Sequence, residues 1–110
     1  MEGLEKFTQL RSLWLNENKL TKLPEGLEKL TQLKVLSLAD NQLTSVNGLE
    51  KLTQLTHLAL HKNLLTDVPK GLEKLTQLQL LYLDDTPDLT KAQIDELKMA
   101  LPKCKIFSDF

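Results

Sequence analysis

Leucines recur along this chain at a fixed spacing, with polar residues between them. Three consecutive stretches follow the pattern L-x-x-L-x-L-x-x-N-x-L, at residues 10–20, 33–43 and 55–65. The central L-x-L places two apolar side chains on one face of an extended segment, because successive side chains of a strand point to opposite faces. The same pair recurs at positions 81 and 83. The pattern therefore predicts four short strands, each with one buried face.

A second element repeats between these strands. The octamer GLEKLTQL occurs at residues 26–33, 48–55 and 71–78, and GLEKFTQL at residues 3–10 differs only at Phe7. Its leucines lie three residues apart, which fits one or two turns of helix or 3₁₀-helix packed on a leucine interior. Strands that return in the same phase every 22 or 23 residues stack as a parallel sheet, with the return segments on the opposite side.

The combined motif resembles the leucine-rich repeat family, whose units are roughly 20 to 29 residues long. Three consecutive full matches carry this resemblance, which covers essentially the whole chain. It implies an α/β solenoid, a short right-handed horseshoe with four parallel strands on the concave face and short helical or 3₁₀ turns on the convex face. A C-terminal capping helix would close it, as in bacterial members of the family. The resemblance also implies recognition of a protein or peptide, although a fold does not specify its ligand.

The period divides a single domain, residues 1–110, into four units and a cap. The units span residues 3–25, 26–47, 48–70 and 71–90, and the cap spans residues 90–110. Pro24 and Pro69 occupy the turn of the first and third units, whereas the second unit is one residue shorter and has Val46-Asn47-Gly48 without a proline. We expect this shorter unit to change the curvature locally.

The asparagine of the motif has a structural role of its own. Asn18, Asn41 and Asn63 stand where the chain leaves each strand. An amide side chain carries both donors and acceptors, so it can satisfy turn backbone groups that would otherwise be unpaired inside the stack. We therefore expect a ladder of asparagine side chains along the solenoid.

The fourth unit departs from the pattern in a way that predicts a cap. Thr86 replaces the motif asparagine, and the next leucine comes one residue late. Thr90 and Gln93 have the spacing of a capping box, so a helix is expected from Lys91 to Leu101, where Pro102 ends it. Residues 103–107 are then expected to return as an extended edge.

At the other end, the first unit has no preceding unit to bury it. We therefore expect Leu4, Phe7 and Leu10 to form an exposed apolar edge that invites self-association. Three explanations remain open: a fragment of a longer array, an engineered minimal array, and a protein that closes this end by forming a homodimer. The near identity of the octamers fits recent duplication and consensus engineering equally well.

The outward positions of the strands form columns across the sheet. One column holds two aromatic residues, Trp14 and Tyr82, with small residues between them. Exposed tryptophan and tyrosine are enriched at binding hot spots, although these two could equally serve to shield the first and last strands. We predict a concave surface that binds a protein or peptide, formed by Trp14, Val35, Ser37, His57, Ala59, His61, Leu80 and Tyr82.

Few residues suggest catalytic chemistry. His57 and His61 lie on one strand about 13 Å apart, too far to share a zinc ion, so we expect neither a metal nor another cofactor. Cys104 is the only cysteine, and two flanking lysines could lower the pKa of its thiol, but no histidine lies near it in sequence. Because a glycine-rich phosphate loop is also missing, we do not expect an enzyme.

Charge and composition exclude further classes of partner. The formal net charge is -1 at pH 7, which disfavours nucleic acid because phosphate backbones attract basic surfaces. The sequence has no apolar stretch near the roughly 20 residues that span a bilayer, and its start lacks the features of a signal peptide. A single cysteine suits a reducing compartment. We expect a soluble, cytoplasmic protein without membrane contact.

Overall fold

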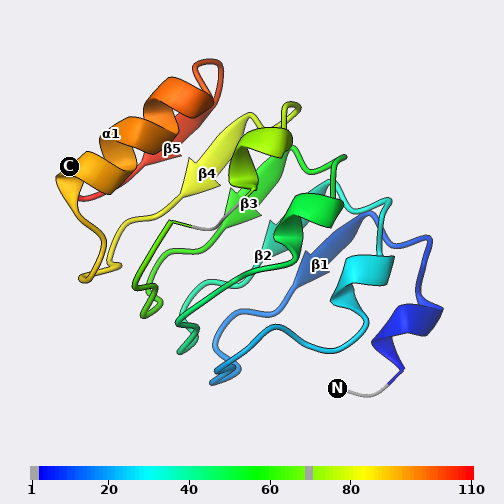
Figure 1. The fold of residues 1–110 in the computed structure, drawn as a ribbon. Helices are drawn as coiled ribbons and strands as arrows, with labels where there is room; N and C mark the ends of the chain where they lie inside the picture. Colours follow the sequence, from blue (N-terminus) through cyan, green and yellow to red (C-terminus); the bar gives the residue numbers. More distant parts are fainter. Residues whose placement is uncertain (1–2, 69–70) are drawn as a thin grey trace.

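The computed structural model describes residues 3–68 and 71–110. Within these residues the chain forms a parallel sheet of five strands in the order β1-β2-β3-β4-β5 (Figure 1). The strands are β1 Ser12–Trp14, β2 Val35–Ser37, β3 His57–Ala59, β4 Leu80–Tyr82 and β5 Lys105–Phe107. Four of them are the predicted repeat strands. The fifth arises from the segment predicted to be extended, and it adds one strand to the four that the repeat predicts.

The strands pair in the register that the repeat predicts. The central residue of each strand aligns across the sheet, in the order Leu13, Leu36, Leu58, Leu81 and Ile106. The residues on either side align in the same way, so each column of outward side chains runs straight across the strands. Every unit therefore presents the same face to the same side of the molecule.

In the described part of the chain, the core is a stack of leucines between the sheet and four short 3₁₀ turns (Figure 1). The first leucine of each turn is buried, whereas the glutamate and lysine that follow it are mostly exposed. The turns are η1 Leu4–Lys6, η2 Leu27–Lys29, η3 Leu49–Lys51 and η4 Leu72–Lys74. Since one turn is too small to bury an apolar face alone, each unit depends on its neighbours for burial.

Two buried asparagines join consecutive units. Asn63 is 1% exposed; its Nδ2 donates to the carbonyl of Leu38 in the preceding unit at 2.9 Å, and its Oδ1 accepts from the amide of Leu43 at 3.0 Å. Asn41 joins the second unit to the first, with Nδ2 donating to the carbonyl of Leu15 at 3.0 Å. These contacts confirm the predicted ladder at Asn41 and Asn63, and they satisfy backbone groups that water does not reach. Asn18 is exposed, and its Nδ2 donates to the carbonyl of Asn16 in its own unit.

The chain leaves each repeat strand through a residue in the left-handed backbone region. Glu17, Asp40, Lys62 and Asp85 have φ values of 58°, 57°, 58° and 54°. Each of these residues lies three positions after the end of its strand, where the backbone turns away from the sheet. Pro24 is half-buried in the segment that descends to η2, while Pro69 lies outside the described residues.

The C-terminal cap has the predicted start. Helix α1, Lys91–Ala100, begins with a complete capping box, in which the Thr90 side chain accepts from the Gln93 amide at 3.2 Å and the Gln93 side chain accepts from the Thr90 amide at 2.9 Å. The helix ends at Ala100, one residue earlier than predicted, with Leu101 as its C-cap. Its buried face covers the last leucine turn, and β5 then adds to the edge of the sheet (Figure 1).

The first unit is better buried than the sequence predicts. The expectation that Leu4 is exposed is wrong, because Leu4 is only 7% exposed and belongs to the leucine core. Its side chain points into the interior, where η1 packs against η2. Leu10 is half-buried, whereas Phe7 remains 57% exposed. The exposed apolar edge is therefore smaller than the predicted one and centres on Phe7.

We predict that Asn63→Ala lowers the free energy of unfolding by about 3 kcal/mol, because it leaves buried backbone groups unpaired and opens a cavity. Asn18→Ala is the matched control, since the same motif position is exposed in the first unit; it should cost less than about 0.5 kcal/mol. Urea unfolding followed by circular dichroism measures both values. Equal losses for the two variants would contradict a structural role for the buried ladder.

Candidate binding surface

The aromatic column of the concave face has one freely exposed member. Trp14 is 63% exposed at the outer end of the column, on the edge strand β1. Ser37 and Ala59 follow it on β2 and β3, and Tyr82 and Phe107 occupy the same position on β4 and β5. An exposed indole on a short, paired strand is a large apolar contact whose backbone is already ordered.

The other end of the column is a packed aromatic cluster. The rings of Tyr82 and Phe107 are stacked, with centroids 4.7 Å apart and an angle of 7° between the planes. His61 meets the Tyr82 ring edge to face at 5.7 Å, and the Nζ of Lys105 lies 5.2 Å from the centroid of the Phe107 ring. Tyr82 is therefore held on both sides, and the cluster presents a rigid, half-buried surface.

Sequence reasoning did not include Phe107 in the surface. The sequence predicts an extended segment at residues 103–107, but the repeat does not predict its register. Phe107 follows Tyr82 by 25 residues rather than by the 22 or 23 of the repeat. The helical cap separates the two strands, so the repeat spacing no longer applies. Alignment of Ile106 with the central leucines would have identified Phe107 as the next member of the column.

Ser37 is less available than predicted. It is 7% exposed, and its hydroxyl donates a hydrogen bond to the Oδ1 of Asn16 on the neighbouring chain segment. The small residues between Trp14 and the aromatic cluster therefore form a low floor, of which the half-buried Ala59 is the accessible part. Val35, His57 and Leu80 are half-buried in the adjacent column.

The two rims of the concave face carry opposite charge. At the amino ends of the strands the exposed charged residues are basic: Arg11, Lys34 and Lys105. At the carboxyl ends acidic residues predominate, and they are Glu17, Asp40, Asp84, Asp85 and Asp109, interrupted by Lys62. A partner therefore meets a potential that changes sign across the width of the sheet.

Asp109, in the acidic rim, accepts the last hydrogen bond in the row that joins neighbouring units at the carboxyl ends of the strands. The amide of Lys62 donates to the carbonyl of Asp84 in the next unit at 3.0 Å. After the fourth unit no repeat follows, and the amide of Asp85 donates instead to the carboxylate oxygens of Asp109 at 3.2 and 3.1 Å. A side-chain carboxylate thus takes the place of the missing carbonyl at the end of the sheet.

The histidines and the cysteine show no catalytic arrangement. His57 pairs with its neighbour Thr56, with Nδ1 2.9 Å from Oγ1, and within residues 3–68 and 71–110 there is no cluster of side chains that could hold a metal ion. The pKa of the Cys104 thiol is raised by burial, so the lowering considered from its two flanking lysines is wrong. A raised pKa reduces the thiolate fraction, which is the nucleophilic form.

Comparison with known proteins connects the sequence pattern to a family. A profile described as leucine-rich repeats in two copies matches residues 8–51 and 31–70, together more than half of the chain. Comparison with functionally curated proteins gave no match.

Solved structures of several bacterial proteins have a similar fold. A leucine-rich repeat protein of Leptospira interrogans is 37% identical, with a TM-score of 0.83 over 92% of this chain and 25% of that chain. Two internalins of Listeria monocytogenes, inlF and internalin C2, are each 26% identical, with TM-scores of 0.80 and 0.77 over 96% and 93% of this chain. The chain spans 36% and 42% of those internalins, so it corresponds to a part of each of these proteins.

The two ends of the aromatic column should differ in their effect on stability. Tyr82→Ala removes a ring packed between His61 and Phe107, so it should lower the free energy of unfolding by about 2 kcal/mol. Trp14→Ala removes a mostly exposed ring and should cost less than about 0.5 kcal/mol. Thermal and urea unfolding of the two variants test this difference. A loss for Trp14→Ala as large as that for Tyr82→Ala would show that the indole is a structural element.

Proposed function

We propose that this chain, which belongs to the leucine-rich repeat family, is a non-catalytic module that binds a protein or peptide on its concave face. Members of this family generally mediate protein–protein interaction and are typically not enzymes. The observation that carries the proposal is the indole of Trp14, which is 63% exposed in line with the Tyr82–Phe107 stack. Large aromatic side chains near the centre of a contact supply most of the energy in many interfaces.

The arrangement suits recognition because most of the surface is ordered before a partner arrives. The strands are hydrogen-bonded in register, and Tyr82 is packed against Phe107 and His61. A preordered surface loses little side-chain entropy on binding, which favours affinity. Rims of opposite charge favour one orientation of the partner over the reverse.

The remaining parts of the proposal concern the surroundings of the protein. A cytoplasmic location is supported by the single cysteine, which suits a reducing compartment. None of the helices in the described parts of the chain is long and apolar enough to cross a membrane. The acidic rim beside the aromatic column disfavours a nucleic acid on this face, because phosphates would be repelled there.

Selection of ligands from a random peptide library displayed on phage tests the concave surface directly. The selected peptides should lose about tenfold or more in affinity for Trp14→Ala, because a truncated hot-spot ring typically costs that much or more. Met99→Ala is the matched control, since Met99 is 83% exposed on α1, away from the sheet, and it should bind normally. Calorimetry measures the affinities. Ligands whose binding is unaffected by Trp14→Ala would contradict the proposal.

A second candidate function is self-association through the first unit, as a structural scaffold or building block, natural or engineered. The observation that favours it is Phe7, which is 57% exposed in the same unit as the edge strand β1. An exposed ring and an unpaired sheet edge in one unit can meet their equivalents in a second copy and form an isologous dimer.

Light scattering over a wide concentration range distinguishes the two candidates. If the chain is a dimer through its first unit, Phe7→Lys should make it a monomer, because it places two lysines at the twofold contact, and Trp14→Ala should leave the dimer intact. A dimer lost only in Trp14→Ala would locate the contact on the concave face instead. A monomer at every concentration would eliminate self-association as the function of this chain.

A further inference from the structure

The convex face is divided into two pairs of turns. Turn η1 packs closely with η2, and η3 packs closely with η4, so the wider spacing falls between η2 and η3. The second unit, which connects these two turns, has 22 residues where the first and third have 23. The division of the convex face therefore coincides with the short spacing between Gly26 and Gly48.

The surroundings of the glycine that precedes each 3₁₀ turn differ after the short second unit. A Cβ atom at Gly26 would lie 2.9 Å from Oε2 of Glu5, and one at Gly71 would lie 2.9 Å from Cβ of Glu50. A Cβ atom at Gly48 would meet nothing within 4 Å. The glutamate of the preceding turn thus covers Gly26 and Gly71, whereas its equivalent, Glu28, leaves Gly48 uncovered.

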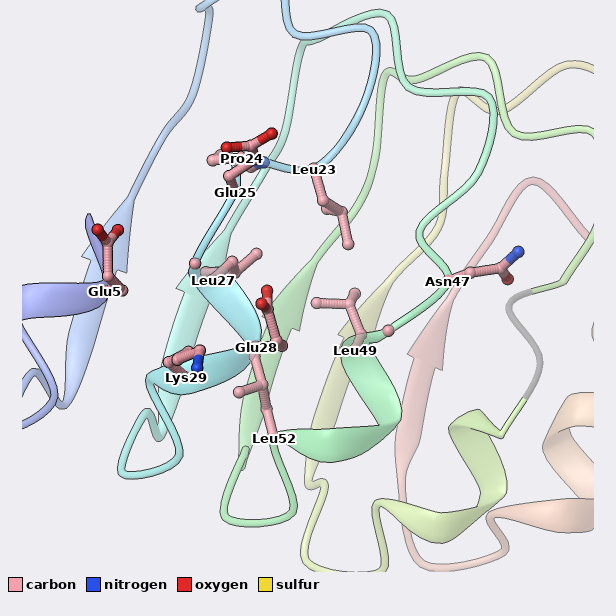
Figure 2. A pocket seen from close by; sticks show the side chains of 12 residues that line it. Glu5, Leu23, Pro24, Glu25, Leu27, Glu28, Lys29, Asn47, Leu49 and Leu52 are labelled. Atoms are coloured by element: carbon pink, nitrogen blue, oxygen red, sulfur yellow. The ribbon is translucent and has the colours of Figure 1, made fainter. Parts of the chain in front are cut away.

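A groove of about 530 Å³ lies in front of this uncovered glycine. Figure 2 shows Glu5 on one side of it, Leu27 and Glu28 on η2 in the middle, and Leu49 on η3. Leu23 and Pro24 line the groove as half-buried apolar residues, beside the buried core leucines Leu27, Leu49 and Leu52, so part of its lining is accessible apolar surface. The volume falls within the range of sites that hold a few side chains of a ligand.

The rim of the groove is acidic. Glu5, Glu25 and Glu28 are exposed carboxylates in its lining, and Lys29 is the one exposed basic residue there. The apolar part of the lining, from Leu23 and Pro24, and the net negative rim together complement an apolar side chain that is followed by a positive charge, because burial and charge attraction then act together. An acidic segment would meet the same lining but would be repelled at the rim.

We propose that this convex groove binds a peptide segment of a partner protein in which an aliphatic residue is flanked by lysine or arginine. The site lies on the face opposite Trp14, so it is independent of the concave surface and would let one chain contact two partners at once. It exists because the second unit is one residue short; a unit of 23 residues would place Glu28 over Gly48, as Glu5 lies over Gly26.

Titration of the ¹⁵N-labelled full chain with a synthetic peptide of alternating leucine and lysine tests the proposal. We expect saturable shifts of the amide signals in residues 23–29 and 47–52, and a weaker affinity at high salt because the rim contacts are exposed. A peptide with glutamate in place of lysine is the control and should bind at least about tenfold more weakly. Shifts confined to the concave strands, or equal binding of the two peptides, would overturn the proposal.

Two sets of variants separate the groove from general charge effects. The double variant Glu25→Gln/Glu28→Gln should weaken the leucine–lysine peptide about fivefold, since exposed carboxylates each contribute a fraction of a kcal/mol. Glu73→Gln/Glu96→Gln changes the net charge equally at exposed positions outside the groove, and it should leave the affinity unchanged. Equal weakening by both doubles would reduce the interaction to non-specific attraction and overturn the site.

Restoring the repeat length tests the origin of the groove. Insertion of one proline after Val46 makes the second unit as long as its neighbours, and it should bring Glu28 over Gly48 and abolish the peptide-induced shifts. Binding of a phage-selected ligand to the concave face should persist in this variant, so loss of the groove is distinguishable from loss of the proposed function. Full binding of the leucine–lysine peptide by the insertion variant would contradict the proposal.

Discussion

A buried turn destabilises the folded state when its backbone N–H and C=O groups have no hydrogen-bond partner. In this solenoid the asparagine side chains supply those partners. Asn63 bridges the third unit to the second, and Asn41 bridges the second to the first. Each of these hydrogen bonds forms only when the two units are aligned at equivalent positions after their strands, so it keeps consecutive units in register. The straight columns of the concave face follow from this alignment, as does the leucine stack behind them.

The two ends of the array satisfy this requirement differently. At the C-terminal end Thr86 replaces the asparagine and its hydroxyl donates within its own unit, to the carbonyl of Leu83 at 2.6 Å. The carboxylate of Asp109 then accepts the last outward amide, and α1 covers the leucines. At the other end Phe7 and Trp14 remain exposed. The first unit therefore keeps two large apolar side chains exposed, while the cap buries the last leucines of the array.

A repeat places any irregularity at a predictable location, and this chain has one on each face. On the concave face, the cap adds Phe107 to a column that otherwise follows the repeat. On the convex face, the missing residue of the second unit leaves Gly48 uncovered and opens a groove. The Tyr82–Phe107 stack and the convex groove thus arise where the period is broken, because identical units otherwise cover one another in the same way, whereas Trp14 belongs to a regular unit.

The period, the phase of the four repeat strands, the parallel register and the asparagine ladder could be predicted from the amino-acid sequence, because each depends on contacts that recur at a fixed spacing. The capping box could be predicted because it is a local motif. Features that depend on contacts outside that spacing required the three-dimensional structure. It paired Tyr82 with Phe107 across the cap, buried Leu4 against the second unit and raised the pKa of Cys104 by burial. It also decided which glutamate covers which glycine, since that depends on how one short turn packs against its neighbour rather than on the motif they share.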